Sequence, residues 1–507
     1  MSNNKQIAVN VITSIISFGL NCIINFFISP YIIEQLGSEA YGFVRLSTDF
    51  ANYATLLTVA LNSMASRFLM IELHKGNIKE AQKYYSSLLI ANAFLAAIIA
   101  IPATICVIFL EKIIEIPKGL EVQVRLTFAI TFVKFLADLL FSATGLCFYL
   151  SNRLDKSNIR TLESNIIKTC ITIGLLVLFG ADISYVAIAA LIASVYVIAT
   201  NIYYKNKLVP DLKFNVNDFD FSKIKKLLSA GIWNSVTKLS QLLTSGLSLL
   251  ITNMWISATA MGYLSVAKTV PNLMISLNGT VAGMFTPNMT MLYAENDTKA
   301  LVKAAKSAIK LMTMFVVIPN AILVSLGVEF YELWVPSQPA RVIQILAILT
   351  VVNSCITGPI QPLYQIFTVL NKVKQSSKIM LVYGFISIII TYFVVQYTDA
   401  GVYGVVSISM LGSIIVALGY HIPYSAKYLG CSRWTFYPEV IKSMISFLVL
   451  SIIGYGIKQI IPISSWGLWF ADAILLGLIG LGVNSLLVLS VDERVMLVNK
   501  IKNKIKK

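Results

Sequence analysis

Long apolar stretches separated by short polar segments recur along the whole chain. Each stretch is about 20 residues or longer, which is enough to cross the hydrocarbon core of a bilayer as a helix. A lipid-facing barrel would instead show strands of about ten alternating residues, and that pattern is absent. Because backbone groups in lipid must be satisfied internally, the pattern predicts an all-α membrane protein with about fourteen transmembrane helices. The predicted spans are 8–33, 42–70, 84–110, 124–150, 161–180, 184–204, 228–256, 262–291, 304–327, 341–370, 376–396, 400–425, 438–460 and 466–490.

Composition agrees with this pattern. Hydrophobic residues make up 57% of the 507 residues and charged residues only 13%, against about 25% charged residues in soluble globular proteins. The first apolar segment, Ile7 to Ile33, is too long for a signal-peptide core and is expected to remain as the first helix.

The net charge of +16 is distributed unevenly between the loops. Alternate loops, with the N-terminal segment and the tail, hold most of the basic residues. The opposite loops hold only Lys112, Lys118, Arg125, Arg341 and Lys458. The positive-inside rule therefore predicts that both termini lie in the cytoplasm and that the chain resides in the inner, cytoplasmic membrane. Basic loops against an anionic leaflet explain the charge without nucleic-acid binding.

A shift of the sequence by 220 residues against itself aligns two similar segments. The segment LGSEAYGF, Leu36 to Phe43, falls on ISATAMGY, Ile256 to Tyr263, and HKGNIKEA falls on AENDTKAL. The shift equals six predicted spans, an even number, so the copies run in the same direction through the membrane. The predicted organisation is an N-lobe of six helices (1–204), a cytoplasmic connector (205–227) whose charges form a solvated surface, a six-helix C-lobe (228–425), and two further helices with a basic tail (426–507).

Polar residues form continuous faces on four predicted helices, 1, 2, 7 and 8. In helix 7, the spacing of polar positions from Asn234 to Thr252 alternates between four and three residues. The 220-residue shift places Ser14, Asn21 and Asn25 of helix 1 on equivalent positions of helix 7. Helix–helix hydrogen bonding explains single Ser or Thr residues, but the matched stripes predict a hydrated cavity. The candidate cavity-lining residues are Asn21, Asn25, Asn52, Asn234, Gln241 and Asn272.

Three cations accompany these stripes: Arg45, Lys238 and Lys268. A lysine at the bilayer centre costs at least about 2.5–3.5 kcal/mol and should face a partner or water. Because the cations outnumber Asp49, one turn from Arg45, the cavity should favour an anion such as phosphate.

Other charges within the spans have more local interpretations. Lys134 and Asp138 are spaced i,i+4 and are expected to form an ion pair, with ion coupling at Asp49 or Asp138 as an alternative. Lys168 is expected to extend toward the membrane interface.

Enzymatic chemistry finds little support in the sequence. No phosphate-binding GxxxxGK[ST] loop and no zinc-protease HExxH motif is present, and the cysteines form no CxxC pair. We therefore expect neither catalytic activity, nor a metal, nor a cofactor. Prolines should break several spans: Pro30 ends helix 1, Pro271 and Pro287 interrupt helix 8, and Pro359 and Pro362 interrupt helix 10.

Four segments resemble the polysaccharide-export branch of the MOP superfamily, the Wzx-type O-antigen and capsule flippases. They are LGSEAYG, SRFLMIELHKGNIKEA, VAGMFTPNMTMLYAENDTKAL and PLYQIFTVLNKVKQSSK. The resemblance covers nearly the whole chain. It implies two six-helix lobes plus two extra helices, alternating access, and transport of an undecaprenyl-pyrophosphate-linked oligosaccharide. The positions that match a cationic family cavity are Arg45, Lys238 and Lys268.

The resemblance leaves two other transport functions open. A cation-coupled drug exporter would need a membrane carboxylate at its substrate site, and helix 1 has none before Glu34. A lipid II flippase shares the implied fold, but helix 1 carries no arginine cluster. A membrane scaffold or a glycan polymerase is an alternative from another class, and the short predicted external loops disfavour a polymerase. The implied partners are the lipid-linked oligosaccharide, membrane lipid, an H⁺ or Na⁺ counter-ion and a glycan polymerase.

Overall fold

The computed structural model describes residues 3–370, 372–491 and 493–495, so the basic residues from Lys500 onward lie outside the described part. The described residues are almost entirely helical and fall into two compact units, 1–265 and 266–507. Twelve helices in this part of the chain are long and apolar enough to cross a membrane. They correspond to predicted spans 1–6 and 9–14.

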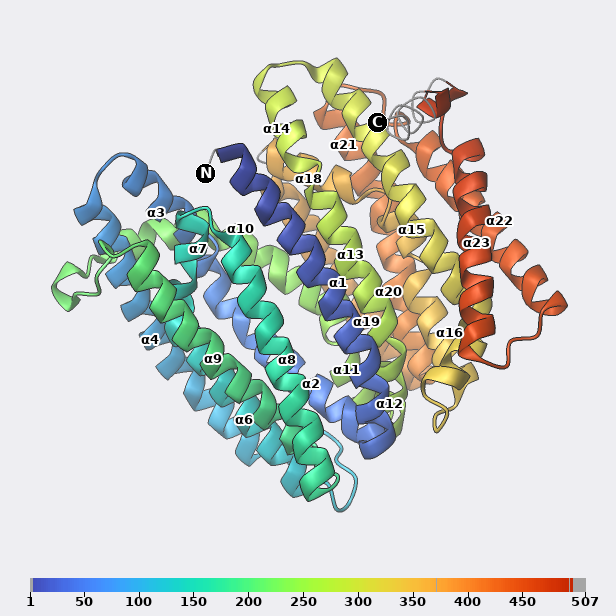
Figure 1. The fold of residues 1–507 in the computed structure, drawn as a ribbon, viewed down its shortest axis with the longest axis horizontal. Helices are drawn as coiled ribbons and strands as arrows, with labels where there is room; N and C mark the ends of the chain where they lie inside the picture. Colours follow the sequence, from blue (N-terminus) through green and yellow to red (C-terminus); the bar gives the residue numbers. More distant parts are fainter. Residues whose placement is uncertain (1–2, 371, 492, 496–507) are drawn as a thin grey trace. The chain divides into compact units, whose positions relative to one another are not determined.

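Unit 1 begins with nine long or short α-helices and continues into a segmented span (Figure 1). Its elements are α1 (Asn3–Leu36), α2 (Ser38–Asn62), α3 (Ala65–His74), α4 (Ile78–Ile108), α5 (Leu110–Ile113), α6 (Glu121–Phe141), η1 (Ser142–Gly145), α7 (Leu146–Leu150), α8 (Leu154–Phe179), α9 (Ser184–Leu208), η2 (Val216–Asp218), α10 (Phe221–Gln241), η3 (Leu242–Gly246) and α11 (Ser248–Trp255). Helix α12 (Ala258–Ala267) crosses the boundary between the units.

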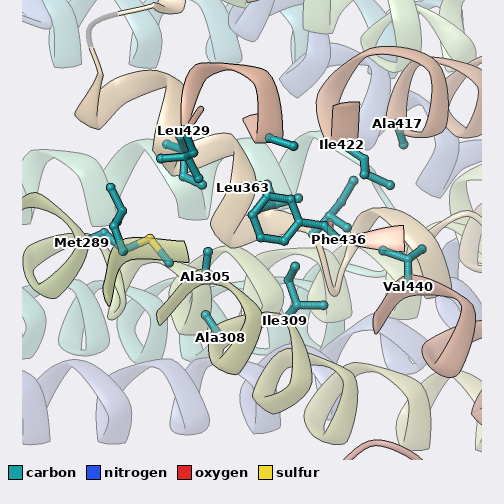
Figure 2. Packing of buried hydrophobic residues seen from close by; sticks show 14 of the residues in the cluster. Met289, Ala305, Ala308, Ile309, Leu363, Ala417, Ile422, Leu429, Phe436 and Val440 are labelled. Atoms are coloured by element: carbon teal, nitrogen blue, oxygen red, sulfur yellow. The ribbon is translucent and has the colours of Figure 1, made fainter. Parts of the chain in front are cut away.

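Unit 2 contains the remaining helices. They are α13 (Thr269–Gly283), α14 (Thr286–Ala294), α15 (Thr298–Trp334), α16 (Ala340–Val351), α17 (Ser354–Thr357), α18 (Gln361–Val369), α19 (Val373–Tyr397), α20 (Gly401–Val416), η4 (Ala417–His421), α21 (Ile422–Tyr428), α22 (Tyr437–Ile460) and α23 (Trp466–Leu487). Figure 2 shows an apolar cluster of this unit, with Phe436 among Ile309, Leu363 and Val440. Burying such side chains contributes roughly 1.5–3 kcal/mol each relative to exposure in water.

Predicted spans 7 and 8 exist as series of short helices rather than as continuous ones. Span 7 is α10, the π-helical turn η3 and α11, and span 8 is α12, α13 and α14. The break between α12 and α13 falls at Lys268. Pro271 explains this position, because it has no N–H to donate to the carbonyl of Ala267 four residues earlier. The predicted break of span 10 is also present, between α17 and α18 beside Pro359 and Pro362.

One expectation from the sequence was wrong, and another holds only in part. Pro30 does not end the first helix, because α1 continues through it to Leu36. Most charged side chains of the connector are exposed, as expected, including Asp211 and Lys213. The connector is nevertheless anchored, because the backbone N–H groups of Asn215 and Asp220 donate hydrogen bonds to the hydroxyls of Ser86 and Ser87 on α4. Lys223 is buried and forms an ion pair with Glu80, which raises the pKa of Lys223. The connector is therefore docked on α4.

Positions equivalent under the 220-residue shift contact one another within residues 1–265. Thr259 donates a hydrogen bond to Glu39, and a Cβ added to Gly42 would lie 3.2 Å from Cα of Gly262. Residues near a two-fold axis are expected to meet their own equivalents, so these contacts support the parallel repeat. The lobe boundaries predicted from the repeat, 1–204 and 228–425, stay a prediction, because α10 packs on α2 within unit 1.

Candidate functional site

Helices α2 and α10 pack closely in unit 1. Gly231 of α10 faces the backbone of α2, where an added Cβ would lie 1.9 Å from the carbonyl oxygen of Ala60. Further along, the Ser235 hydroxyl donates to the carbonyl of Leu56 at 3.2 Å. Since residue numbers rise on one helix as they fall on the other, the two helices are antiparallel. This close contact fixes which side chains of the two helices come to the same level.

The antiparallel register places Lys238, three residues beyond Ser235, at about the level of Tyr53 and its neighbour Asn52. The side chain of Lys238 is half-buried and forms no hydrogen bond or ion pair with another described residue, although its backbone carbonyl accepts a hydrogen bond from Leu242. Asn52 and Gln241 are exposed. We call Arg45, Asp49, Asn52, Lys238 and Gln241 the α2/α10 polar strip.

The π-helical turn η3 directly follows the polar strip on α10. A π-turn inserts an extra residue into the helix, and such turns occur frequently at functional sites. Tyr53 of α2 donates a hydrogen bond to the carbonyl of Gly246, the last residue of η3, at 2.9 Å. Asn234, at the other end of the predicted stripe, donates to the hydroxyl of Ser63 at 3.0 Å. These two hydrogen bonds therefore join α2, and the residue that follows it, to η3 and to α10 on either side of Lys238.

Arg45 is held by its own helix. Its Nε donates to the hydroxyl of Tyr41 at 3.0 Å, and the guanidinium carbon lies 5.4 Å from the centre of that ring. Asp49 lies close enough to attract Arg45 electrostatically, in agreement with the expected partial neutralisation. Tyr41 nevertheless supplies the hydrogen bond, a role that the sequence did not indicate.

A further cation approaches Arg45 from α8. Lys168 is close enough to interact electrostatically with both Arg45 and Lys134, and with the hydroxyl of Tyr41. The sequence had suggested only that Lys168 extends toward the interface. No spacing on α2 could reveal its position, because it depends on how α8 packs in the tertiary structure. Unit 1 therefore gathers three cations, which we call the unit 1 cation cluster: Arg45, Lys134 and Lys168.

Lys134 and Asp138 form the predicted ion pair. Nζ of Lys134 lies 2.7 Å from Oδ2 of Asp138, and the hydroxyl of Ser194 on α9 donates to the other carboxylate oxygen. Both carboxylate oxygens thus have partners. Ion coupling at Asp138 or Asp49 stays a prediction.

The polar face of α1 makes a different kind of contact. Asn165 of α8 donates to the amide oxygen of Asn21 at 2.7 Å, and Asn158 donates to Ser14 at 2.7 Å. Asn25 is exposed and donates to the backbone carbonyl of Asn21. We call these contacts the α1/α8 amide ladder. They join helices, and a glycan-binding role for Asn21 and Asn25 stays a prediction.

The two candidate residues of unit 2 lie at the start of α13. Lys268 occupies the position just before its first turn, and its backbone carbonyl accepts a hydrogen bond from the N–H of Asn272 at 3.0 Å. The Asn272 side chain is exposed. Among the described residues, no group of three or more His, Cys, Asp or Glu side chains could hold a metal ion.

Comparison with known proteins agrees with this architecture. Residues 7–293, more than half of the chain, match the family model described as polysaccharide biosynthesis protein. The chain belongs to this family. The matched region spans α1 to α14 and so includes the α2/α10 polar strip and Lys268.

A curated relative aligns with this chain over almost the full length of both proteins. The uncharacterized membrane protein EpsK of Bacillus subtilis strain 168 is 26% identical over 461 residues, which is 91% of each chain. Among solved structures, the lipid II flippase MurJ in an inward closed conformation aligns with a TM-score of 0.70 at 16% identity, covering 94% of this chain and 98% of MurJ. An inward-facing multidrug resistance transporter of the MATE family aligns with a TM-score of 0.62 at 15% identity, covering 83% of this chain and 98% of that chain.

The solved structures show the fold, and the family model shows the family. The chain is a multi-pass membrane protein with an all-helical, MOP-type transporter fold, as the sequence predicted.

Proposed function

We propose that this protein moves an undecaprenyl-pyrophosphate-linked oligosaccharide, a polysaccharide repeat unit, from the cytoplasmic to the outer leaflet by alternating access. The observation that carries the proposal is Lys238, whose half-buried cationic side chain has no partner in the described chain, on α10 at the start of predicted span 7. Retaining such a lysine costs a few kcal/mol unless it meets water or an anion. A pyrophosphate supplies that anion.

The proposal assigns the charged and polar residues separate roles. Arg45, Lys238 and Lys268 bind the pyrophosphate, and exposed amides bind sugar hydroxyl groups. The exposed amides are Asn25, Asn52, Gln241 and Asn272. Asn21 and Asn234 complete the predicted set, but each already has a side-chain partner and would have to exchange it for a sugar.

The same hypothesis includes the location of the protein. Both termini lie in the cytoplasm and the chain resides in the inner membrane, as the distribution of basic loops predicts. An H⁺ or Na⁺ counter-ion would act through Asp49 or Asp138, and a glycan polymerase would receive the product. Nucleic acid and cofactors have no part in this function.

Reconstituted flipping tests the proposal directly. The full chain is placed in vesicles with a polyprenyl-pyrophosphate oligosaccharide carrying a fluorescent sugar, and an impermeant quencher reports the label that has changed leaflet. We expect Lys238→Ala to slow flipping at least about tenfold, since hydrogen bonds to charged groups contribute about 1.5–3 kcal/mol. Lys238→Arg should retain most activity. Lys225→Ala, an exposed lysine of the same helix, is the matched control.

The alternatives give different results in the same vesicles. Equal flipping by Lys238→Ala and the unmodified chain would overturn the proposed role of this cation. Transport of lipid II, without transport of other pyrophosphate-linked glycans, would show that the chain is a lipid II flippase. Export of cationic drugs without glycolipid flipping would assign it to drug efflux.

A further inference from the structure

An apolar groove lies between α19 and α20 in unit 2, and none of its lining residues belongs to the site assigned above. Its volume is about 620 Å³, within the roughly 300–1,000 Å³ of ligand pockets. One wall is a stripe on α19 with a spacing of four residues: Lys378, Val382, Ile386 and Ile390. The other wall comes from α20 and includes Leu411 and Ile415.

The floor of the groove is built for close packing. Tyr383 lies against Gly412, where an added Cβ would be 2.1 Å from the ring, and the Tyr383 hydroxyl donates to the carbonyl of Ser409 at 3.2 Å. Because Gly412 has no side chain, the tyrosine ring can lie flat between the helices. The apolar residues of the walls remain outside this contact: Ile386 is 49% exposed and Ile415 is 68% exposed.

The ends of the groove differ in charge. Lys378 stands at the N-terminal end of the α19 stripe, with Lys374 one turn before it, whereas the end at Ile390 is apolar. None of the described lining residues is acidic. A ligand that fits would therefore have an anionic head and an apolar chain.

The length of the groove selects among such ligands. From Lys378 to Ile390 the helix rises about 18 Å, at about 1.5 Å per residue. One leaflet contributes about half of the roughly 30 Å hydrocarbon core. The groove is thus about one leaflet deep, which matches an acyl chain of a leaflet lipid and is too short for a long polyprenyl chain.

We propose that the α19/α20 groove binds an anionic phospholipid, with its phosphate at Lys378 and one acyl chain along Val382, Ile386 and Ile390. The occupant is a resident lipid, distinct from the transported glycolipid. The proposal does not depend on the transported substrate, so it can fail while the proposed flippase function holds, and the reverse.

Native mass spectrometry of the full chain tests this binding. The protein is released from nanodiscs containing equal amounts of phosphatidylglycerol and phosphatidylcholine, and retained lipids are counted. We expect retained phosphatidylglycerol in the unmodified chain, with about a fivefold loss in Lys378→Gln, since one basic residue near the headgroups contributes about that factor. Ile386→Trp should fill the groove and remove the adduct. Ile389→Trp, at a 55% exposed neighbour outside the groove, should retain it.

The other outcomes decide against the proposal. Equal retention in Ile386→Trp and Ile389→Trp would show that the lipid binds elsewhere. Equal retention of phosphatidylcholine and phosphatidylglycerol would remove the role of Lys378. If polyprenyl phosphate displaced phosphatidylglycerol, and did so in the unmodified chain but not in Ile386→Trp, the groove would instead bind the lipid tail of the substrate. Flipping assays on the same variants separate a failed groove from a failed transport function.

Discussion

Two polar helix pairs in unit 1 use similar residues in opposite ways. In the α1/α8 amide ladder, Asn21 and Asn165 bond to each other across the interface. In the α2/α10 pair, the helices meet through Gly231 and backbone atoms, while Asn52 and Gln241 remain exposed. Spacing along the sequence is the same in both cases, with polar positions three or four residues apart. The difference therefore comes from the facing helix.

When the facing helix presents an amide, the polar side chains form hydrogen bonds with it and join the two helices. A facing glycine brings two helix axes close together and leaves long polar side chains beside the contact rather than within it. The first arrangement joins two helices of unit 1, and the second leaves polar groups exposed, which the proposed function assigns to the substrate. The predictions below test this distinction, beginning with the contact that should matter most.

Gly231→Ala should cause the largest loss of stability. Its Cβ would lie 1.9 Å from a backbone oxygen of α2, which cannot move without shifting the helix. Overpacking typically costs 1–3 kcal/mol and occasionally more, so we expect a loss of about 3 kcal/mol. Thermal unfolding in detergent measures the change. Gly174→Ala on α8, where an added Cβ meets nothing within 4 Å, is the control. Equal behaviour of both variants would show that α2 and α10 do not pack so closely.

Substitutions of Lys134 and Lys238, two lysines of unit 1, should affect stability and flipping differently. Lys134→Met removes the partner of Asp138 and should cost about 1–3 kcal/mol, because the carboxylate loses a charged hydrogen bond. Lys238→Met removes no bond found in the described chain and should change stability by less than about 0.5 kcal/mol, yet reduce flipping. Paired unfolding and flipping measurements check both. A large loss of stability in Lys238→Met would mean that this lysine has a structural role.

Much of the fold followed from hydropathy. Long apolar stretches without the alternation of a barrel strand predict helices, and twelve of the predicted spans correspond to described helices that are long and apolar enough to cross a membrane. Some of these are interrupted, such as span 2 between α2 and α3. Spans 7 and 8 are segmented for local reasons that hydropathy averages away. Pro271 indicates one break, but the π-turn η3 contains no residue that marks it.

The candidate site followed only in part. The i,i+4 spacing of Lys134 and Asp138 predicted their ion pair, since both lie on one helix. Lys168 joins Arg45 from a helix distant in sequence, so only packing reveals it. Asn21 and Asn52 looked alike as members of polar stripes. Whether an amide meets another amide depends on the neighbouring helix, which a single sequence does not specify.

The amide ladder should show a smaller, measurable coupling. Asn165→Leu alone leaves the amide of Asn21 without its partner and should cost about 1 kcal/mol. Asn21→Leu with Asn165→Leu should cost less than the sum of the single changes, by about 0.6 kcal/mol, the average for polar pairs between membrane helices. A double-mutant cycle on thermal unfolding gives the value. Additive effects would mean that the two amides do not interact.

The smallest effect concerns a paired charge outside the membrane spans. Glu493, in the segment after α23, accepts hydrogen bonds from Lys310 and Ser490. Partial burial alone would raise the pKa of Glu493, but these hydrogen bonds lower that pKa below 4.5. A depressed pKa in the folded state means that the pair stabilises the protein above about pH 4.5 and that this contribution is lost as the pH falls through the folded-state pKa.

We therefore expect acidification below pH 4.5 to lower the melting temperature of the unmodified chain slightly more than that of Glu493→Gln. The corresponding difference in the free energy of unfolding should be less than about 1 kcal/mol, because this pair is partly exposed. Glu295→Gln, at an exposed glutamate without an ion pair in the described chain, should retain the full pH dependence. If both glutamine variants keep it, the Lys310–Glu493 pair contributes nothing. The paired carboxylate of Glu493 would then contribute as little to stability as the unpaired side chain of Lys238. In that case, the difference between paired and unpaired polar groups would apply only to the helix pairs compared above.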